Sequence, residues 1–396
     1  MTLDDLAFLL SAEGQRWLAD VAKMEITPQT HLQVASWLRQ KLPKTQAQAV
    51  LETIVLRQHA TTKFSHAGDM YFVRAALEQA SPELVAQHRA RRFAALGCTQ
   101  IADLGCGIGG DALVLAAHAE VTGVEWDPVR LAMAQENVRA YGFGSQFHPL
   151  QADLLSLTPL TQMDALFFDP ARRDERGRRF FSLADYQPPL SLVDEWRKVV
   201  ADTAVKISPG VDYAELPTDA EVEFISLNGE MKEAVLWYGR FHSGVARRAT
   251  LLPEAHTLTT ADLPTEPIPS IAPKAYLYEP DGAVIRAHLV QALAAQLGAN
   301  QIDDEIAYLT GETAVATPFA RCFAVEDLFP FQLKNLRHYL RERQVGSVTI
   351  KKRGSPLEPD KLQRQLRLSG PKENHRILFL THVLGEPSVI VSGEEV

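Results

Sequence analysis

The sequence predicts an α/β protein in which a helical N-terminal region precedes two units of alternating strands and helices. Three observations lead to this fold class. Residues 1–95 show helical periodicity, residues 98–241 alternate between short apolar strands and helices, and the alternation resumes at Lys274. Alternation of this kind is typical of a parallel sheet with crossover helices. A length of 396 residues also exceeds one average domain, so two or three domains are expected.

The composition is typical of a soluble globular protein, with 46% apolar and 22% charged residues. No apolar run reaches the roughly 18 residues that a membrane-spanning helix needs, and the acidic start M-T-L-D-D-L lacks the basic residues of a secretory signal. The scattered cysteines, Cys98, Cys106 and Cys322, give neither a disulfide framework nor a zinc-ligand spacing. We therefore expect a cytoplasmic protein with no metal and no membrane partner.

Residues 1–95 are predicted to form a helical domain. Apolar residues recur at helical spacing from Leu32 to Leu42, whereas the polar segment 63–72 interrupts the pattern. Ser81 followed by Pro82 supplies a cap and a first-turn proline. A further helix is therefore expected to lead into the central domain.

The central domain is expected over residues 96–245. Its predicted strands cover 99–104, 120–125, 147–152, 163–168, 204–207, 221–227 and 234–241. The helices predicted between them cover 111–119, 128–141 and 190–200. No helical pattern separates the last two strands, so we expect an antiparallel hairpin that closes the sheet.

The remaining chain is divided by its proline content. Residues 246–273 are rich in proline and show little periodicity, which predicts a linker. Residues 274–396 are predicted to form the second domain. Its expected strands are 275–278, 322–325, 347–350, 376–383 and 388–391, and its expected helices are 284–297, 332–343 and 360–368.

A glycine-rich turn follows the first strand of the central domain, where residues 101–111 read I-A-D-L-G-C-G-I-G-G-D. Asp103, Gly105, Gly107 and Gly109 fall at every second position. Glycine in such a turn permits unusual backbone angles and the close approach of a ligand, and the free N–H groups of the following helix bind polar groups. All four residues are therefore candidate cofactor-binding residues.

Acidic residues lie at the ends of three successive predicted strands: Asp103, Glu125 and Asp153. In an open parallel sheet, ligands bind at the carboxyl ends of the strands. Glu125 can accept hydrogen bonds from both hydroxyls of a ribose, and Asp153 from the amino group of an adenine. A dinucleotide would place its pyrophosphate at the turn, whereas a carboxylate there suits the positive charges of S-adenosylmethionine. Helix capping alone would explain one of these acids but hardly all three.

These residues resemble the class I S-adenosylmethionine-dependent methyltransferases, and the resemblance covers about 98–241. It implies a Rossmann-like sheet of seven strands, in which the closing hairpin is similar to the reversed seventh strand of that family. It also implies S-adenosyl-L-methionine as cofactor, with Asp103, Gly105 and Gly107 lining its methionine part. Glu125 and Asp153 would hold the ribose and the adenine.

The fourth predicted strand ends in a second motif, F-D-P-A-R-R. Methyltransferases that act on exocyclic amino groups carry an Asp/Asn-Pro-Pro-aromatic tetrad here, whose carboxylate or amide and a backbone carbonyl accept hydrogen bonds from the amino group. That contact directs the nitrogen lone pair toward the methyl group, so catalysis is chiefly positioning. Asp169 and Pro170 match the tetrad and are candidate catalytic residues, but Ala171 and Arg172 replace its second proline and its aromatic residue.

The tetrad therefore lacks its own aromatic platform for a base. Phe64, Tyr71, Phe72 or Tyr186 could supply one, or Arg172 could stack on the base instead. Arg172 and Arg173 could also guide phosphates. A strand-ending Asp-Pro turn without a catalytic role remains the structural alternative.

Methylation of a base carbon is disfavoured. It requires a cysteine nucleophile, usually after the fifth strand. The chain has Lys206-Ile-Ser-Pro-Gly210 at that position, and no cysteine between Cys106 and Cys322.

Two further resemblances concern the substrate. Residues 71–91 resemble the stretch ahead of the glycine motif in trimethylguanosine-synthase-type enzymes. The C-terminal part resembles the α+β THUMP-like domain of a group of bacterial methyltransferases, on residues 276–282, 317–319, 351–354 and 362–367. THUMP domains bind structured RNA, so an RNA partner, tRNA or rRNA, is implied.

Charge in the C-terminal domain agrees with an RNA partner. The whole chain has a net charge of −9, but residues 334–376 hold twelve Lys/Arg against four Asp/Glu, a local charge of +8. Such a segment suits phosphate contacts, and Lys351, Lys352 and Arg353 are candidate substrate-binding residues.

The leading hypothesis is methylation of an exocyclic amino group in RNA, with guanine as the favoured base. A protein or small-molecule acceptor is a second hypothesis, because Arg172 is unusual. A non-catalytic RNA-binding protein on the same scaffold is a third, which the intact set of acids disfavours. The sequence leaves the oligomeric state open.

Overall fold

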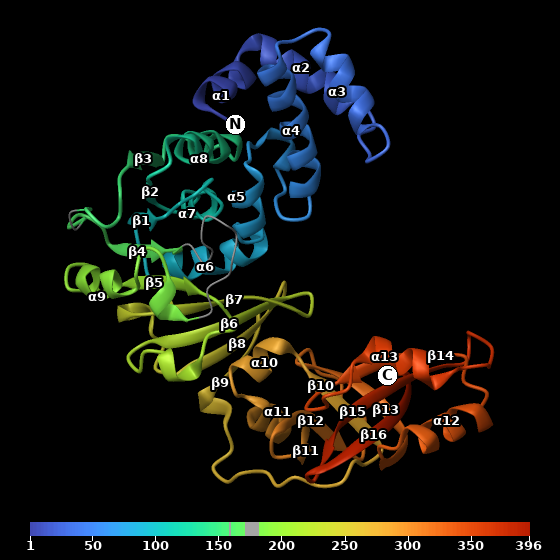
Figure 1. The fold of residues 1–396 in the computed structure, drawn as a ribbon. Helices are drawn as coiled ribbons and strands as arrows, with labels where there is room; N and C mark the ends of the chain where they lie inside the picture. The colour runs from blue at the N-terminus through green and yellow to red at the C-terminus, as the bar shows by residue number, and fades with distance from the viewer. Residues whose placement is uncertain (158–159, 171–181) are drawn as a thin grey trace. The chain divides into compact units, whose positions relative to one another are not determined.

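The computed structural model describes residues 1–157, 160–170 and 182–396 (Figure 1). The chain divides into two compact units, one of Met1–Glu221 with Lys232–Gly244 and one of Val222–Met231 with Val245–Val396. Over the described residues its strands form a nine-stranded and a seven-stranded sheet. These features confirm the predicted fold class, in which helices precede an α/β sheet and a strand-rich α+β part follows it.

Helices occupy the N-terminal part of the first unit. They are α1 (Leu3–Leu10), α2 (Ala12–Ala22), α3 (His31–Arg39), α4 (Lys44–Ala60), α5 (Arg74–Gln79) and α6 (Glu83–Ala95). A capping box between Thr2 and Asp5 starts α1, whose buried residues Leu6 and Leu9 lie on one helix face. The helix α6 leads directly into the first strand of the sheet, as predicted. The predicted Ser81 cap is wrong, because Pro82 occupies the N-cap position. The Ser81 hydroxyl instead donates a hydrogen bond to Glu233 and accepts one from Arg89.

The nine-stranded sheet positions the candidate site. Its strands are β1 (Gln100–Leu104), β2 (Glu120–Glu125), β3 (Phe147–Gln151), β4 (Ala165–Phe168), β5 (Thr203–Ile207), β6 (Glu221–Leu227), β7 (Glu230–Trp237), β8 (Arg247–Leu252) and β9 (His256–Thr259). They are ordered β3-β2-β1-β4-β5-β7-β6-β8-β9. The strands β1 to β5 run parallel, and β7 is antiparallel to β5. A reversed strand therefore follows the parallel set, as expected. The hairpin of β6 and β7 does not close the sheet, however, because β8 and β9 extend it from the expected seven strands to nine.

Crossover helices connect the parallel strands. They are α7 (Ala112–Leu115), α8 (Pro128–Ala140) and α9 (Ser191–Arg197). Each of β1, β4 and β5 is buried along almost its whole length. Strands that are covered on both faces are typical of parallel sheets flanked by helices, which is why these short apolar runs pair as they do.

Two predicted boundaries are wrong. The last strand spans 230–237 rather than 234–241, because Asn228 and Gly229, both at positive φ, already form a two-residue hairpin turn. The segment 246–273, predicted as a linker, contains β8 and β9. In the second unit β8 pairs in parallel with β6, and β9 pairs antiparallel with β8. These strands depend on their pairing partners, which a local sequence pattern does not reveal.

The seven-stranded sheet belongs to the second unit. Its strands are β10 (Tyr276–Pro280), β11 (Asn300–Asp303), β12 (Ile306–Gly311), β13 (Ala320–Pro330), β14 (Ser347–Lys352), β15 (His375–Val383) and β16 (Glu386–Glu395). They are ordered β11-β12-β10-β13-β16-β15-β14. Within the described residues, neighbouring strands of this sheet pair antiparallel, except that β14 pairs in parallel with β15.

The helices of this unit are α10 (Gly282–Arg286), α11 (Val290–Leu297), α12 (Leu333–Glu342) and α13 (Pro359–Leu366). The prediction of a single helix over 284–297 is wrong. The helix is interrupted at His288, whose φ of 52° is incompatible with a continuous right-handed helix. The helices α12 and α13 both bury leucines, including Leu336 and Leu362, in one cluster with β15 and β16. A shared apolar cluster therefore fixes both helices to the same part of the sheet.

Among the described helices, none combines the length and apolar content needed to cross a bilayer.

Candidate active site

The glycine turn connects β1 to α7 and packs closely against its neighbours. The amide of Gly105 donates to the carbonyl oxygen of Val124 at 2.9 Å, which ties the turn to β2. Gly105 and Gly109 have φ values of 81° and 80°. A Cβ on Gly105 would lie 3.1 Å from the carbonyl oxygen of Asp169, and a Cβ on Gly109 would lie 3.1 Å from the Cα of Ala134. Glycine is needed at both positions for the backbone angle and for the close approach.

Asp103 lies near the end of β1 and is 1% exposed. Within the part of the chain that the structure describes, neither of its carboxylate oxygens has a hydrogen-bond partner. Burial raises the pKa of this carboxyl well above its ordinary value, and the nearby Asp111 and Asp169 raise it further. An unpaired carboxylate in the interior is costly. The position therefore fits a ligand that brings a positively charged group, because such a group would pair with the carboxylate and favour its charged form.

Glu125 ends β2 and turns toward the glycine turn. Its Oε2 accepts a hydrogen bond from the amide of Gly107 at 3.0 Å, and its Oε1 accepts one from the amide of Asp127 at 3.0 Å. The side chain is buried, and burial raises the pKa of its carboxyl. These two contacts fix both oxygens at the mouth of the turn. Each oxygen retains a second lone pair that can accept a hydrogen bond from a ligand hydroxyl.

Asp153 follows β3 on the same edge of the sheet, because Glu125 pairs with Gln151 across the two parallel strands. Its Oδ1 accepts a hydrogen bond from the amide of Leu155 at 2.9 Å, and its side chain is exposed. Two large apolar side chains flank these acids in solvent. Trp126 is 68% exposed and Leu155 is 63% exposed. Sequence reasoning missed both, although each directly follows or lies next to a strand-end acid.

Asp169 follows β4 and forms a buried contact that the sequence did not predict. The ammonium of Lys206, on β5, donates to its Oδ2 at 2.6 Å. The side chain of Lys206 is 2% exposed, whereas that of Asp169 is 25% exposed. The amide of Asp169 donates to the carbonyl oxygen of Leu104 at 3.2 Å. Both the backbone and the side chain of Asp169 are therefore held, and the adjacent Pro170 is buried.

A second buried ion-pair network lies beside the turn. Arg89 of α6 is 1% exposed and pairs with the carboxylates of Asp111 and Glu233, and it donates to Ser81 Oγ at 3.1 Å. Its guanidinium also lies 5.0 Å from the ring centre of Phe167. The network joins α6, the start of α7 and β7. The sequence signal was an arginine on the apolar face of a predicted helix.

The aromatic residues considered as a base platform are buried. Phe64 is 2% exposed, and its ring lies 3.7 Å from the position that a Cβ on Gly110 would take. Tyr71 and Phe72 are buried beside it, and the hydroxyl of Tyr186 accepts a hydrogen bond from the Ser208 amide at 2.8 Å. The expectation of an open platform from these rings is therefore wrong, since Phe64 packs against the glycine turn instead. Arg172 and Arg173 lie outside the described residues.

The three predicted substrate-binding residues of the C-terminal domain, Lys351, Lys352 and Arg353, differ in their contacts and exposure. Lys351 pairs with Glu279 and lies over the ring of Phe323, and Arg353 lies over the ring of Tyr308. Lys352 is exposed. Further exposed basic side chains lie on or directly after α12 and α13, namely Lys334, Arg341, Lys361, Arg364 and Arg367.

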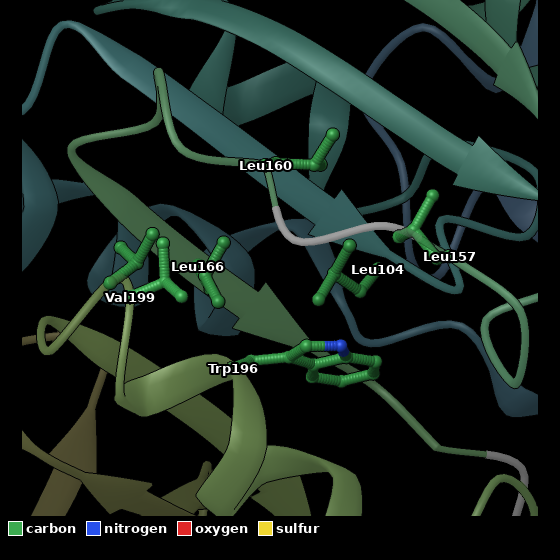
Figure 2. Close-up of a pocket in the computed structure, with 7 residues that line it drawn as sticks. Leu104, Leu157, Leu160, Leu166, Trp196 and Val199 are labelled. Atoms are coloured by element: carbon green, nitrogen blue, oxygen red, sulfur yellow. The ribbon is translucent and has the colours of Figure 1, made fainter.

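The opposite face of the sheet from Asp103 holds a small apolar gap, shown in Figure 2. Leu104 of β1 and Leu166 of β4 line it together with Trp196 of α9 and Leu157. Its volume is about 10 Å³, which is at most the space for one water molecule. The gap is therefore a packing imperfection and not a ligand site. The described residues contain no cluster of His, Cys, Asp and Glu that could hold a metal ion.

Fold and site together define a class of protein. A parallel sheet with a reversed strand, a glycine turn and acids at successive strand ends is the arrangement expected of an S-adenosylmethionine-dependent methyltransferase. The family described as "Methyltransferase domain" matches residues 101–171, and the family described as "THUMP domain-like" matches residues 320–394. A "Domain of unknown function (DUF8688)" matches residues 2–60.

Comparisons with proteins of similar length support the same class of protein. Proteins named "Uncharacterized S-adenosylmethionine-dependent methyltransferase" from two strains of Mycobacterium tuberculosis are 38% identical over 335 residues, covering 82% of this chain and 90% of theirs. A solved structure from Porphyromonas gingivalis W83, described as a candidate methyltransferase, superposes with a TM-score of 0.74 at 20% identity. It covers 94% of this chain and 100% of that one, which shows the shared fold.

The chain belongs to the S-adenosylmethionine-dependent methyltransferases. It is an enzyme whose cofactor is S-adenosyl-L-methionine, and its C-terminal part is THUMP-like.

Proposed function

We propose that this enzyme methylates an exocyclic amino group of a base in structured RNA, with guanine the favoured base and tRNA or rRNA the substrate. The observation that carries the proposal is the position of Asp169. Its carboxylate lies after β4, its backbone packs against Gly105 of the cofactor turn, and its side chain is partly exposed. A hydrogen-bond acceptor is thus held beside the place where the methyl donor binds.

In this proposal the cofactor binds along the edge formed by β1, β2 and β3. Asp103 pairs with the positive charges of the methionine part, which the backbone of Gly105, Gly107 and Gly109 surrounds. The buried carboxylate of Asp103 has no hydrogen-bond partner among the described residues. This supports the role, because a cationic ligand would supply the missing partner.

The nucleoside part would lie next to the following two strands. Glu125 accepts hydrogen bonds from the ribose hydroxyls, and Asp153 accepts one from the adenine amino group. Trp126 and Leu155 supply apolar surface for the adenine ring. Their high exposure supports this assignment, because large apolar side chains in solvent often mark a binding surface.

Bound S-adenosylmethionine supplies a methyl group on sulfur: the acceptor nitrogen forms the new C–N bond with its lone pair, the S–C bonding pair stays on sulfur, and the nitrogen releases a proton. The protein's part is positioning. Asp169 and the carbonyl oxygen of Pro170 accept hydrogen bonds from the amino group, which directs the nitrogen lone pair toward the methyl carbon. The side chain of Asp169 is partly exposed, so the acceptor nitrogen can release its proton to solvent there.

The RNA partner is supported by the C-terminal unit. Its match to a THUMP domain-like family agrees with exposed basic residues on α12 and α13. Cations spaced along a surface bind phosphates and release counterions, so affinity should fall steeply as salt rises. Arg172 and Arg173 are proposed to contact phosphates near the acceptor.

The test uses the full-length protein and RNA isolated from cells that lack it. We expect methylated guanine by mass spectrometry with the wild-type enzyme, and none with Asp169→Ala. Calorimetry with S-adenosylhomocysteine should give the same affinity for both proteins. Undiminished RNA methylation by Asp169→Ala would overturn the role of Asp169. Cofactor binding without any RNA methylation would favour a protein or small-molecule acceptor.

A further inference from the structure

Lys206 is a buried cation next to the proposed acceptor site. Its ammonium donates to Asp169 Oδ2 at 2.6 Å, and its side chain is 2% exposed. Lysine is almost never fully buried without a partner, because its charge would lose its hydration. The burial therefore indicates that the contact with a carboxylate is part of the design of this site.

The strand registers place Lys206 on the same face of the sheet as Asp103. Phe167 of β4 pairs with Asp103 of β1 on one side and with Ala204 of β5 on the other. Side chains alternate along a strand, so Lys206 shares the face of Ala204 and hence of Asp103. The ammonium consequently lies on the side of the sheet that carries both acids, the one proposed for the cofactor and the one proposed for the acceptor.

The contact restrains Asp169 in a specific way. The glycine turn already fixes its backbone, because Gly105 leaves only 3.1 Å between its Cβ position and the Asp169 carbonyl oxygen. The ammonium then holds Oδ2, which sets the plane of the carboxylate. In the proposal Oδ1 is the oxygen that accepts the hydrogen bond from the acceptor amino group.

We propose that Lys206 is a positioning residue for methyl transfer, which holds the Asp169 carboxylate oriented toward the acceptor amino group. The inference rests on the proposed function, since it assumes that Asp169 contacts the acceptor. Lys206 itself forms no bond to the methyl group. In this proposal it acts on methyl transfer through Asp169.

The experiment is a double-mutant cycle with Lys206→Met and Asp169→Asn. Methionine matches the length and volume of the lysine chain without its charge, and asparagine keeps an oxygen acceptor without needing a cation. Lys206→Met alone should lower kcat on RNA by about 10- to 100-fold, the range seen when a partner that orients a functional group is lost. Its KM for S-adenosylmethionine should change less than its kcat, because the charge of Lys206 acts on the proposed cofactor ligand Asp103 only through space. Lys198→Met, an exposed lysine paired with Glu195, is the matched control and should have no effect.

The double variant separates positioning from a purely structural role. If Lys206 acts through the Asp169 carboxylate, removing its ammonium should not lower kcat further once that carboxylate is absent. Asp169→Asn and the double variant should therefore have equal kcat. A kcat of the double variant below that of Asp169→Asn would overturn the proposal, as would wild-type kcat in Lys206→Met. If Lys206→Met alone fails to fold, the kcat of Asp169→Asn can still be compared with that of the double variant, and this comparison tests the proposal.

The result also separates this inference from the proposed function. Retained methylation in Asp169→Ala would contradict the proposed function. Loss of methylation in Asp169→Ala together with full activity in Lys206→Met would contradict only the role of Lys206.

Discussion

Replacement of Asp103 by asparagine should make the empty protein more stable and weaken its binding of the cofactor. Asp103 is 1% exposed and its carboxylate has no hydrogen-bond partner among the described residues. A buried polar group left without a partner costs about 1–3 kcal/mol, and more when it is charged. Asparagine is still a buried polar group but carries no charge, so the substitution removes the part of the cost that the charge causes. Each kcal/mol gained in the free energy of unfolding should raise Tm by roughly 2–4 °C in a protein unit of this size.

The pH dependence follows from the direction of the pKa shift. The pKa of Asp103 is raised in the folded protein, chiefly by burial. The folded wild type is therefore favoured while Asp103 is protonated and loses stability as pH rises through the folded pKa. Asparagine does not titrate, so the difference in Tm between Asp103→Asn and wild type should grow with rising pH and vanish in acid.

Cofactor affinity should change in the opposite sense. Loss of one charge from a buried, hydrogen-bonded pair costs about 2–5 kcal/mol. Asparagine keeps an oxygen acceptor, so we expect the lower part of that range, about 2–3 kcal/mol, or roughly 30- to 150-fold weaker binding.

Thermal unfolding across a pH series and calorimetry with S-adenosylhomocysteine measure both effects. Asp153→Asn is the control, since its exposed side chain should give no gain in Tm. An Asp103→Asn protein with unchanged or lower Tm and undiminished cofactor affinity would refute the reasoning.

Three other outcomes can be measured directly. Gly109→Ala should lower stability by about 1–3 kcal/mol because its φ is 80° and the new Cβ meets Ala134. Gly68→Ala, with no atom within 4 Å, should be neutral in the same denaturation assay. Trp126→Ala should weaken S-adenosylhomocysteine binding by about 1–3 kcal/mol, as expected for a lost base–aromatic stack, and unchanged affinity in calorimetry would argue against the stack. Lys361→Ala with Arg364→Ala should reduce the slope of log K against log salt for RNA binding by roughly 1.4–1.8 in filter binding; an unchanged slope would place the RNA elsewhere.

The sequence by itself determined the fold class and brought the acids of the proposed cofactor site to one edge of the sheet. Apolar runs of strand length, separated by helical patterns, specify a parallel sheet because each signal is local. The glycine turn is also local, since Asp103 and its glycines lie within a few residues of one another. Acids at strand ends could be assigned to one edge because parallel strands bring their carboxyl ends together.

The tertiary structure alone decided which charges meet in the interior. The contact of Lys206 with Asp169 joins a residue on β5 to the residue that follows β4, and Arg89 joins a helix to Asp111 and Glu233. Such pairings depend on strand register and helix packing, which a sequence read along the chain does not encode locally. The strands β8 and β9 were missed for the same reason, since their pairing partners stabilise them.

Exposure was the other property that only the folded chain settled. Phe64 was expected at the substrate and is buried against the turn, whereas Trp126 passed unnoticed and is 68% exposed. Both are aromatic, and only packing around each ring decides whether it faces solvent. The physical reason is that burial is a sum over contacts from distant parts of the chain, whereas a turn or a helix cap is made by neighbours in sequence.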